Sequence, residues 1–167
     1  MVSHLGRPNG FQDDFSMKKI IDSVEKVLDK KVLLSNDVIG EDSILKASNL
    51  KPREVLLLEN VRFHKEETEG DLNFAKQLSQ LGDCYVNDAF GTAHRAHAST
   101  TIISKFFTNK FFGKLLEKEV LAIKKVMSSG QKPVLAILGG AKISSKIPII
   151  KNIIKIVDDI IICLLYT

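Results

Sequence analysis

The 167-residue sequence contains only two cysteines, Cys84 and Cys163, and each lies in a short apolar run. Two separated cysteines exclude a disulfide framework. Neither has His, Cys or Asp neighbours at the spacing of a zinc site, so no metal site is predicted. We expect both cysteines to be reduced core residues of a cytoplasmic protein.

Long apolar runs are also missing. The longest, residues 160–166, is far too short to cross a bilayer, and polar residues interrupt the N-terminus at once, so neither a membrane partner nor a signal peptide is predicted. The net charge of +4 suits a phosphorylated small molecule as well as nucleic acid. The lysines are scattered at helical spacing, without the basic stripe and interleaved aromatics of nucleic-acid binders. We therefore expect no nucleic-acid partner.

Short β-branched or leucine-rich runs alternate with amphipathic segments along the chain. The spacing of apolar residues predicts helices over 16–30, 71–81 and 113–130, and an isoleucine-rich helix follows Lys146. The strand candidates, with a remnant at Met1–His4, are Val32–Leu34, Val55–Glu59, Cys84–Val86, Val134–Leu138 and Asp159–Leu164. This alternation predicts an α/β fold of βαβ units around a parallel sheet. The charged helix 113–130 fits either an interdomain connector or a peripheral helix.

Three predicted strands end in loops that each carry an arginine and a histidine: Ser3–Gly10, Leu57–His64 and Tyr85–His97. Loops at the carboxyl ends of parallel strands often bind ligands, and the planar arginine side chain suits phosphate or carboxylate. Together the loops predict a basic pocket for a small polyanion. Singly, each arginine could instead pair with an acid such as Glu59 or Glu66, and the third loop could be a connector with local turns.

A fourth loop, Leu138–Lys146, follows another predicted strand. Its two glycines allow backbone amides to approach a phosphate, the next helix adds partial positive charge, and Lys142 and Lys146 supply full charges. With Ser145 as the N-cap, Pro148 would be the third helical residue. The spacing matches neither the Walker pattern nor the dinucleotide fingerprint, and a glycine after a strand with exposed lysines remains the alternative.

No nucleophilic cysteine, Ser/His/Asp set or histidine pair for a metal is suggested beside these loops. Hydrogen-bond donors and cations alone suit phosphoryl transfer, in which positioning and charge stabilisation supply most of the catalysis. The loops also resemble, in order, four motifs of the phosphoglycerate kinase family: Ser3–Pro8, Leu58–His64, Val86–His97 and Ala136–Lys142. The resemblance extends to about Ile162.

This resemblance implies a three-layer Rossmann-like α/β fold with parallel sheets in two lobes. It divides the chain into a partial N-terminal phosphoglycerate-binding lobe over 1–112, a hinge helix over 113–130, and the first βαβ unit of a C-terminal nucleotide-binding lobe over 131–167. It also implies a monomeric, cytoplasmic, glycolytic enzyme. The reaction implied is reversible phosphoryl transfer from 1,3-bisphosphoglycerate to Mg-ADP, giving 3-phosphoglycerate and ATP.

The resemblance also implies roles for particular residues. Those implied to bind the phosphoglycerate are His4, Leu5, Gly6, Arg7, Arg62 and Arg95. Those implied to bind ADP or ATP are Gly139, Gly140, Ala141, Lys142 and Lys146. Lys142 is the implied catalytic residue, because it would reach the transferring phosphoryl group and offset its charge.

The sequence departs from the family pattern at both ends. The family's first strand has no counterpart before Met1, and after Ile162 the chain reads Cys-Leu-Leu-Tyr-Thr where the family has a Gly-Gly-Gly-Met loop. The family's Mg²⁺-holding Asp lies outside this sequence. We expect the 167-residue polypeptide alone to lack appreciable kinase activity, and a non-catalytic anion-binding or regulatory α/β fragment is the alternative function.

Overall fold

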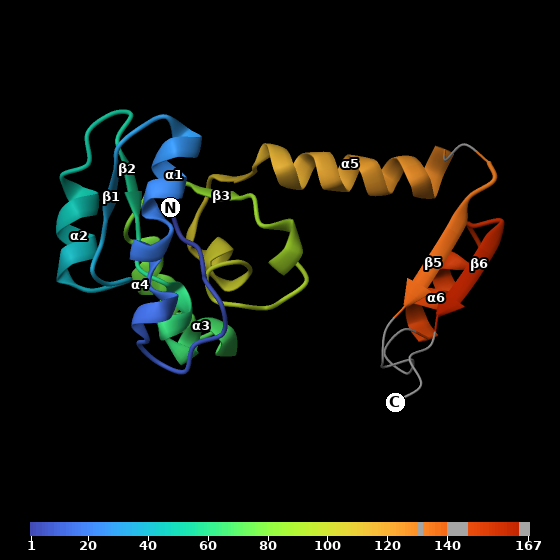
Figure 1. Ribbon diagram of the computed structural model, residues 1–167, viewed down its shortest axis with the longest axis horizontal. Helices are drawn as coiled ribbons and strands as arrows, with labels where there is room; N and C mark the ends of the chain where they lie inside the picture. The colour runs from blue at the N-terminus through green and yellow to red at the C-terminus, as the bar shows by residue number, and fades with distance from the viewer. Residues whose placement is uncertain (130–131, 140–146, 164–167) are drawn as a thin grey trace. The chain divides into compact units, whose positions relative to one another are not determined.

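The computed structural model describes residues 1–129, 132–139 and 147–163. The chain divides into two compact units, Met1–Leu116 and Glu117–Thr167 (Figure 1). Each of the three described strand pairs is parallel, which confirms the α/β class predicted from the alternating pattern. No helix in the described parts of the chain is long and apolar enough to cross a membrane.

The first unit contains two of these strand pairs. Strand β1 (Val32–Leu34) pairs with β2 (Val55–Leu57), and β3 (Tyr85–Asn87) pairs with β4 (Lys110–Phe112). The α-helices are α1 (Ile21–Leu28), α2 (Glu41–Ser48), α3 (Lys65–Glu69), α4 (Leu72–Ser79) and α5 (Lys114–Ser129), which continues into the second unit. The short 3₁₀ helices are η1 (Asp13–Phe15), η2 (Met17–Lys19), η3 (Val61–Phe63), η4 (Phe90–Thr92) and η5 (Ile102–Phe106).

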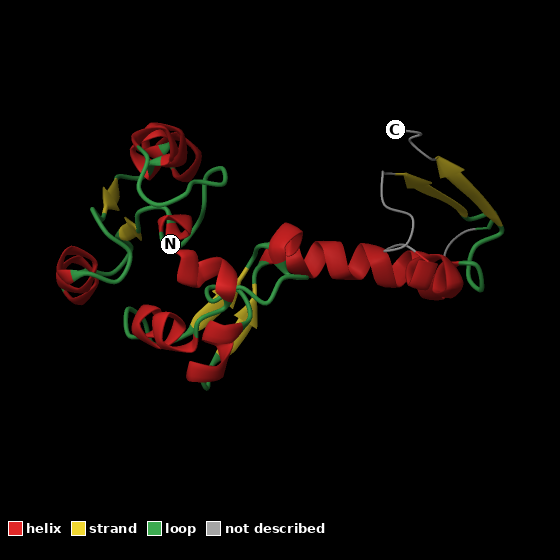
Figure 2. Ribbon diagram, turned by 90° about the horizontal axis from the view of Figure 1, so that it is seen from below, coloured by secondary structure: helices red, strands yellow, loops and turns green. Residues whose placement is uncertain are grey.

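Helices cover both sides of the β1–β2 pair. Figures 1 and 2 show the two strands between α1 and α2. The apolar residues of α1 recur at helical spacing, so Ile21 and Val24 pack together against a core cluster of Met17, Val32 and Leu57. Because Leu57 ends β2 and is part of this cluster, the packing fixes the point at which the next loop begins.

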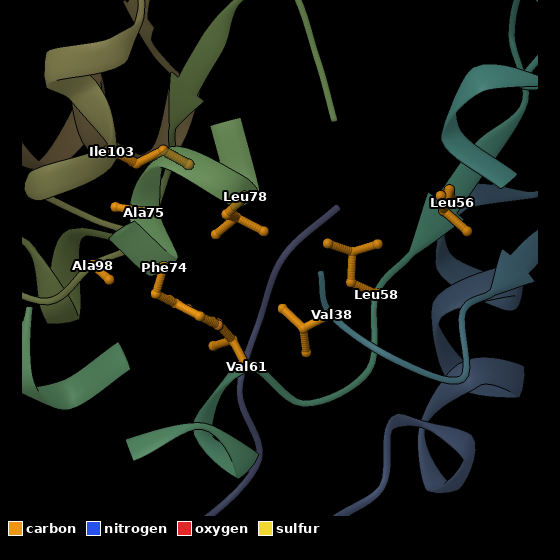
Figure 3. Packing of buried hydrophobic residues seen from close by; sticks show 9 residues of the cluster. All are labelled: Val38, Leu56, Leu58, Val61, Phe74, Ala75, Leu78, Ala98 and Ile103. Atoms are coloured by element: carbon orange, nitrogen blue, oxygen red, sulfur yellow. The ribbon is translucent and has the colours of Figure 1, made fainter. Parts of the chain in front are cut away.

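A second core cluster joins the end of β2 to the helices that follow (Figure 3). Helix α4 contributes Phe74, Ala75 and Leu78, which the 3.6-residue period places on one face. The Asp71 side chain caps this helix by accepting a hydrogen bond from Phe74 N at 2.7 Å. The other members are Val38, Leu56, Leu58, Val61, Ala98 and Ile103. This cluster anchors both the segment after β2 and the segment after β3.

In the second unit, β5 (Leu135–Gly139) pairs with β6 (Asp159–Cys163), and α6 (Ile147–Ile153) lies between them in the sequence (Figure 1). Pro148 is the second residue of the described helix α6. Proline is tolerated there, since the first turn leaves its backbone N–H groups without partners inside the helix. The predicted place of Pro148 as the third helical residue depends on Lys146, which lies outside the described residues. The predicted N-cap, Ser145, lies outside the described residues.

Most predicted elements are present with slightly different ends. The predicted helix over 16–30 is divided into η2 and α1, and the predicted helix over 113–130 is α5. The remnant at Met1–His4 is not a strand, although its backbone lies beside β2: Leu58 N donates to the Met1 carbonyl at 3.0 Å. The prediction missed α2, α3 and β4.

The prediction that both cysteines are core residues is wrong, because Cys84 and Cys163 are free and exposed. Cys163 ends β6, whose apolar side chains are themselves largely exposed, among them Ile161 and Ile162. Cys84 precedes β3, where Val86 is also exposed. Each strand has one partner in these two-stranded sheets, so an apolar run does not ensure burial here.

Candidate anion-binding site

A pocket of about 660 Å³ lies in the first unit, and all three predicted arginine loops contribute to its wall. The basic and ionisable groups that line it are Arg7, Arg62, Arg95, His64, Lys65 and His97, and one acid, Glu66, lines it too. Arg62 lies in η3, which three residues separate from the end of β2, and Arg95 lies in the segment after β3. The carboxyl ends of these strands therefore bring distant basic residues to one place.

The first loop approaches Arg62 through the backbone of Gly6. Arg62 Nη1 donates a hydrogen bond to the Gly6 carbonyl at 2.9 Å. Gly6 has φ of +65°, and a Cβ atom there would overlap the Phe15 ring. The positive φ and the neighbouring ring both require glycine at this position.

The buried side chain of Asn60 also holds the first loop in place by hydrogen bonds. Its side chain is 0% exposed, and its Nδ2 donates to the carbonyls of Leu5 and Phe15, both at 2.8 Å. Its Oδ1 accepts from Arg62 N at 3.0 Å. One buried amide thus joins the first loop to the backbone that carries Arg62.

Glu59, considered above as a partner for an arginine, is also buried and has other partners. Its carboxyl group accepts hydrogen bonds from Ser16 Oγ at 2.6 Å and from the backbone N atoms of Met17 and Asn60, both at 2.7 Å. Among the residues that the structure describes, no carboxyl group lies within ion-pair distance of Arg7, Arg62 or Arg95. In the described part of the chain the three pocket arginines therefore form no ion pair, although Glu66 lines the same pocket.

The end of the third loop is held in place by hydrogen bonds to Ser99 and Thr100, which follow it in the chain. Glu67 accepts from Ser99 N and Ser99 Oγ, at 2.9 and 2.7 Å. The Tyr85 hydroxyl lies 3.0 and 2.9 Å from the carbonyl oxygens of Ser99 and Thr100. Burial, with a smaller contribution from Glu67, raises the pKa of Tyr85 to about 12, so this tyrosine stays a neutral donor.

Two polar residues of this loop stabilise the local fold. Asn87 Oδ1 accepts from Ala89 N at 2.9 Å, which is a local turn of the kind considered above as the alternative. Asp88 Oδ1 accepts from Leu116 N at 2.8 Å, in the first turn of α5. These two side chains are thus occupied with turns and caps, whereas Arg95 and His97 line the pocket.

The cations of the site act on one another. Burial lowers the pKa of His4, and the charges of Arg62, Arg95 and His97 lower it further. Burial and then Arg95 lower the pKa of Arg62, Glu67 acts in the opposite direction, and Arg7 adds a smaller lowering effect. Such mutual repulsion marks a region of concentrated positive charge, which a bound anion would relieve.

Not every predicted phosphoglycerate-binding residue lies on the pocket wall. Arg7, Arg62 and Arg95 do, whereas His4 lies close enough for Arg62 and Arg95 to affect its pKa. The carbonyls of Leu5 and Gly6 hold the first loop in place. His64, Lys65 and His97 also line the pocket. The predicted loops include both histidines, but none of the three was among the residues implied to bind the phosphoglycerate.

The predicted nucleotide-binding residues lie in the second unit. Gly139 ends β5 and pairs with Cys163. Gly140, Ala141, Lys142 and Lys146 lie outside the described residues.

Parallel strands followed by loops that each carry an arginine define this chain as an α/β protein with a basic pocket. Residues 1–164 match the sequence profile described as Phosphoglycerate kinase. The chain therefore belongs to the phosphoglycerate kinase family, as its motifs predicted.

Individual relatives agree with this assignment. The chain is 47% identical to a phosphoglycerate kinase of Aquifex aeolicus and 48% identical to one of Dictyoglomus turgidum, each over 97% of the chain and 41% of the relative. The solved phosphoglycerate kinase of Coxiella burnetii matches with a TM-score of 0.79 and 37% identity, over 96% of this chain and 40% of that one. The Pyrococcus horikoshii enzyme matches with a TM-score of 0.82 and 28% identity, over 98% and 42%. The chain thus spans about 41% of the length of the curated relatives that it matches.

Proposed function

We propose that the pocket binds 3-phosphoglycerate and 1,3-bisphosphoglycerate as part of a phosphoglycerate kinase. The observation that carries the proposal is that three arginines from three separate loops line one pocket without acidic partners among the described residues. A triose carrying a phosphate and a carboxylate has the two kinds of group that guanidinium binds in a bidentate manner.

The proposal extends to the chemistry of the whole protein. Phosphoryl transfer from 1,3-bisphosphoglycerate to ADP, giving 3-phosphoglycerate and ATP, needs charge stabilisation and positioning more than a nucleophilic side chain. In this scheme Gly139, Gly140, Ala141, Lys142 and Lys146 bind ADP or ATP with Mg²⁺. Lys142 offsets the charge of the transferring phosphoryl group.

The lobe division is part of the same proposal. Residues 1–112 form the phosphoglycerate-binding lobe, 113–130 the hinge helix and 131–167 the start of the nucleotide-binding lobe. The enzyme acts in glycolysis in the cytoplasm as a monomer. A polypeptide of these 167 residues alone is inactive, because it aligns with about 41% of the relatives' length. ATP formation by this polypeptide from 1,3-bisphosphoglycerate and Mg-ADP in a coupled assay would contradict the last statement.

Calorimetry with 3-phosphoglycerate tests the binding site. We expect Arg95→Ala to weaken binding by about 10- to 100-fold, which corresponds to one charge-assisted hydrogen-bonded contact. The matched control is Arg53→Ala, which removes the same charge from an exposed position that does not line the pocket and should leave the affinity unchanged. Equal weakening by both variants would indicate a non-specific charge effect, and no weakening by Arg95→Ala would place the binding site elsewhere.

Inorganic phosphate provides the comparison with the alternative function. A phosphoglycerate site should bind 3-phosphoglycerate more tightly than phosphate alone, because the arginines also contact the carboxylate. Equal affinity for both anions would favour a general anion-binding domain over a substrate lobe.

A further inference from the structure

A buried carboxyl group lies behind the wall of the pocket, on a residue that does not line it. Glu67 belongs to α3, and its side chain is 3% exposed. Its Oε1 lies 3.7 Å from His97 Nδ1, and the His97 side chain is 12% exposed. Both of its oxygens also accept hydrogen bonds from Ser99. Glu67 thus connects α3 to the segment that carries Arg95 and His97.

The two segments are also fixed together through their backbones. Ala98 N donates to the Glu67 carbonyl at 2.9 Å. Gly70, which follows α3 with φ of +70°, lies so close to the Ala96 carbonyl that a Cβ atom would overlap it. The backbones that carry Glu67 and His97 are therefore held next to each other by contacts on both sides.

We propose that Glu67 is a positioning residue: its carboxyl group, at ion-pair distance from Nδ1 of His97, favours the proton on Nδ1 by its charge, so that Nε2 is the nitrogen left for an anion. This inference rests on the proposed function of the pocket. Because the neutral ring with a proton on Nδ1 has none on Nε2, it cannot donate a hydrogen bond to an anion from that atom. His97 must gain a second proton to become a donor there.

The charges around His97 determine when that proton is gained. Burial lowers the pKa of His97, Glu67 raises it, and Arg62, Arg95 and His94 lower it again, with a net lowering. His4 also lies within electrostatic reach of His97. This net lowering of the pKa favours the neutral form of His97 in the free pocket. An anion that offsets the arginine charges makes the protonated ring more favourable, so binding takes up a proton.

Glu67 has two opposing effects on an anion. Its negative charge repels the ligand, whereas its support of the protonated His97 ring attracts it. Affinity at a single pH therefore does not isolate the positioning role. The pH dependence does, since only the second effect involves proton uptake.

The first experiment uses the free chain and needs no ligand. Long-range ¹H–¹⁵N NMR spectra report the tautomer and the titration of each histidine. We expect the His97 ring to carry its proton on Nδ1 and its pKa to fall in Glu67→Gln, which keeps hydrogen-bonding atoms but removes the charge. Glu69→Gln, an exposed change of the same kind in the same helix, should leave the His97 titration unchanged. A proton on Nε2, or an unchanged titration in Glu67→Gln, overturns the inference.

The second experiment measures 3-phosphoglycerate affinity between pH 6 and pH 8. One proton taken up on binding changes the affinity by up to about tenfold per pH unit. We expect Glu67→Gln to reduce the gain in affinity on acidification by about threefold or more relative to wild type. His4 and the phosphate group titrate in both proteins, so their contributions cancel in the comparison. Identical pH profiles of the two proteins overturn the inference. Failure of the wild type to bind 3-phosphoglycerate overturns the proposed function instead. In that case the NMR experiment alone decides whether Glu67 controls the protonation of His97.

Discussion

Replacing Asn60 with Ala should loosen the first loop from the backbone that carries Arg62. The Asn60 amide is fully buried and has three hydrogen-bond partners, the carbonyls of Leu5 and Phe15 and the backbone N–H of Arg62. Alanine can replace none of these bonds. The side chain of Asn60 is thus a single support for two walls of the pocket.

The magnitude follows from the number of bonds. A typical intramolecular hydrogen bond contributes about 1 kcal/mol net, and a buried partner left unsatisfied costs about 1–3 kcal/mol. Three bonds of this kind predict a loss of about 3 kcal/mol in the free energy of unfolding. This loss is a large share of the stability of an ordinary domain, which is about 5–15 kcal/mol.

Urea unfolding followed by far-UV circular dichroism measures the effect. The midpoint should fall while the m-value stays constant, because the surface exposed on unfolding is little changed. The matched control is Asn49→Ala: Asn49 is exposed and donates one hydrogen bond, to the Leu45 carbonyl at 2.9 Å, so its replacement should change stability by less than about 0.5 kcal/mol. A loss below about 1 kcal/mol for Asn60→Ala, or an equal loss for both variants, would refute the reasoning.

Three further changes test other parts of the fold. Glu59→Ala should lower the free energy of unfolding by about 3 kcal/mol in urea titrations, because it leaves three buried donors without their acceptor; a variant as stable as wild type would contradict that count. Gly70→Ala should cost about 1–2 kcal/mol in thermal unfolding, since its φ of +70° disfavours alanine and the Ala96 carbonyl leaves no room for Cβ. Burial favours the neutral form of Asp37, but hydrogen bonds from Ser43, Asp42 and Gly40 outweigh it and lower its pKa. A depressed folded-state pKa contributes stability above the unfolded value of about 3.9 and loses it as the pH falls, so Asp37→Asn should flatten the stability curve in acid, and an unchanged curve would count against this carboxyl.

The spacing of apolar residues was sufficient to predict the longer helices. The apolar spacing and the Asp71 cap identify α4, and Leu116, Val120 and Ile123 outline α5, because the 3.6-residue period appears clearly over several turns. Helix α3 has five residues and two of its glutamates are adjacent, so periodicity could not show which of them points inward. The structure shows that Glu67 is the buried one.

For the candidate site, too, some features could be predicted from the sequence and others could not. Its arginines could be found from the sequence because their motifs are local: each follows an apolar run that becomes a strand or lies beside one. The partners of its acids could not, since Glu59 bonds to residues more than forty positions away in the chain and Glu67 to Ser99 at a separation of 32. These pairings depend on how α3, η2 and the segment after β3 pack together.

The sequence by itself determined the α/β class, the family and the arginine loops, because these reside in short-range patterns of residue type. Only the tertiary structure decided that Arg7, Arg62 and Arg95 share one pocket and form no ion pair among the described residues, and that both cysteines are exposed. Burial and charge pairing depend on which distant segments come into contact. Packing sets those contacts, and no local pattern of residues specifies them.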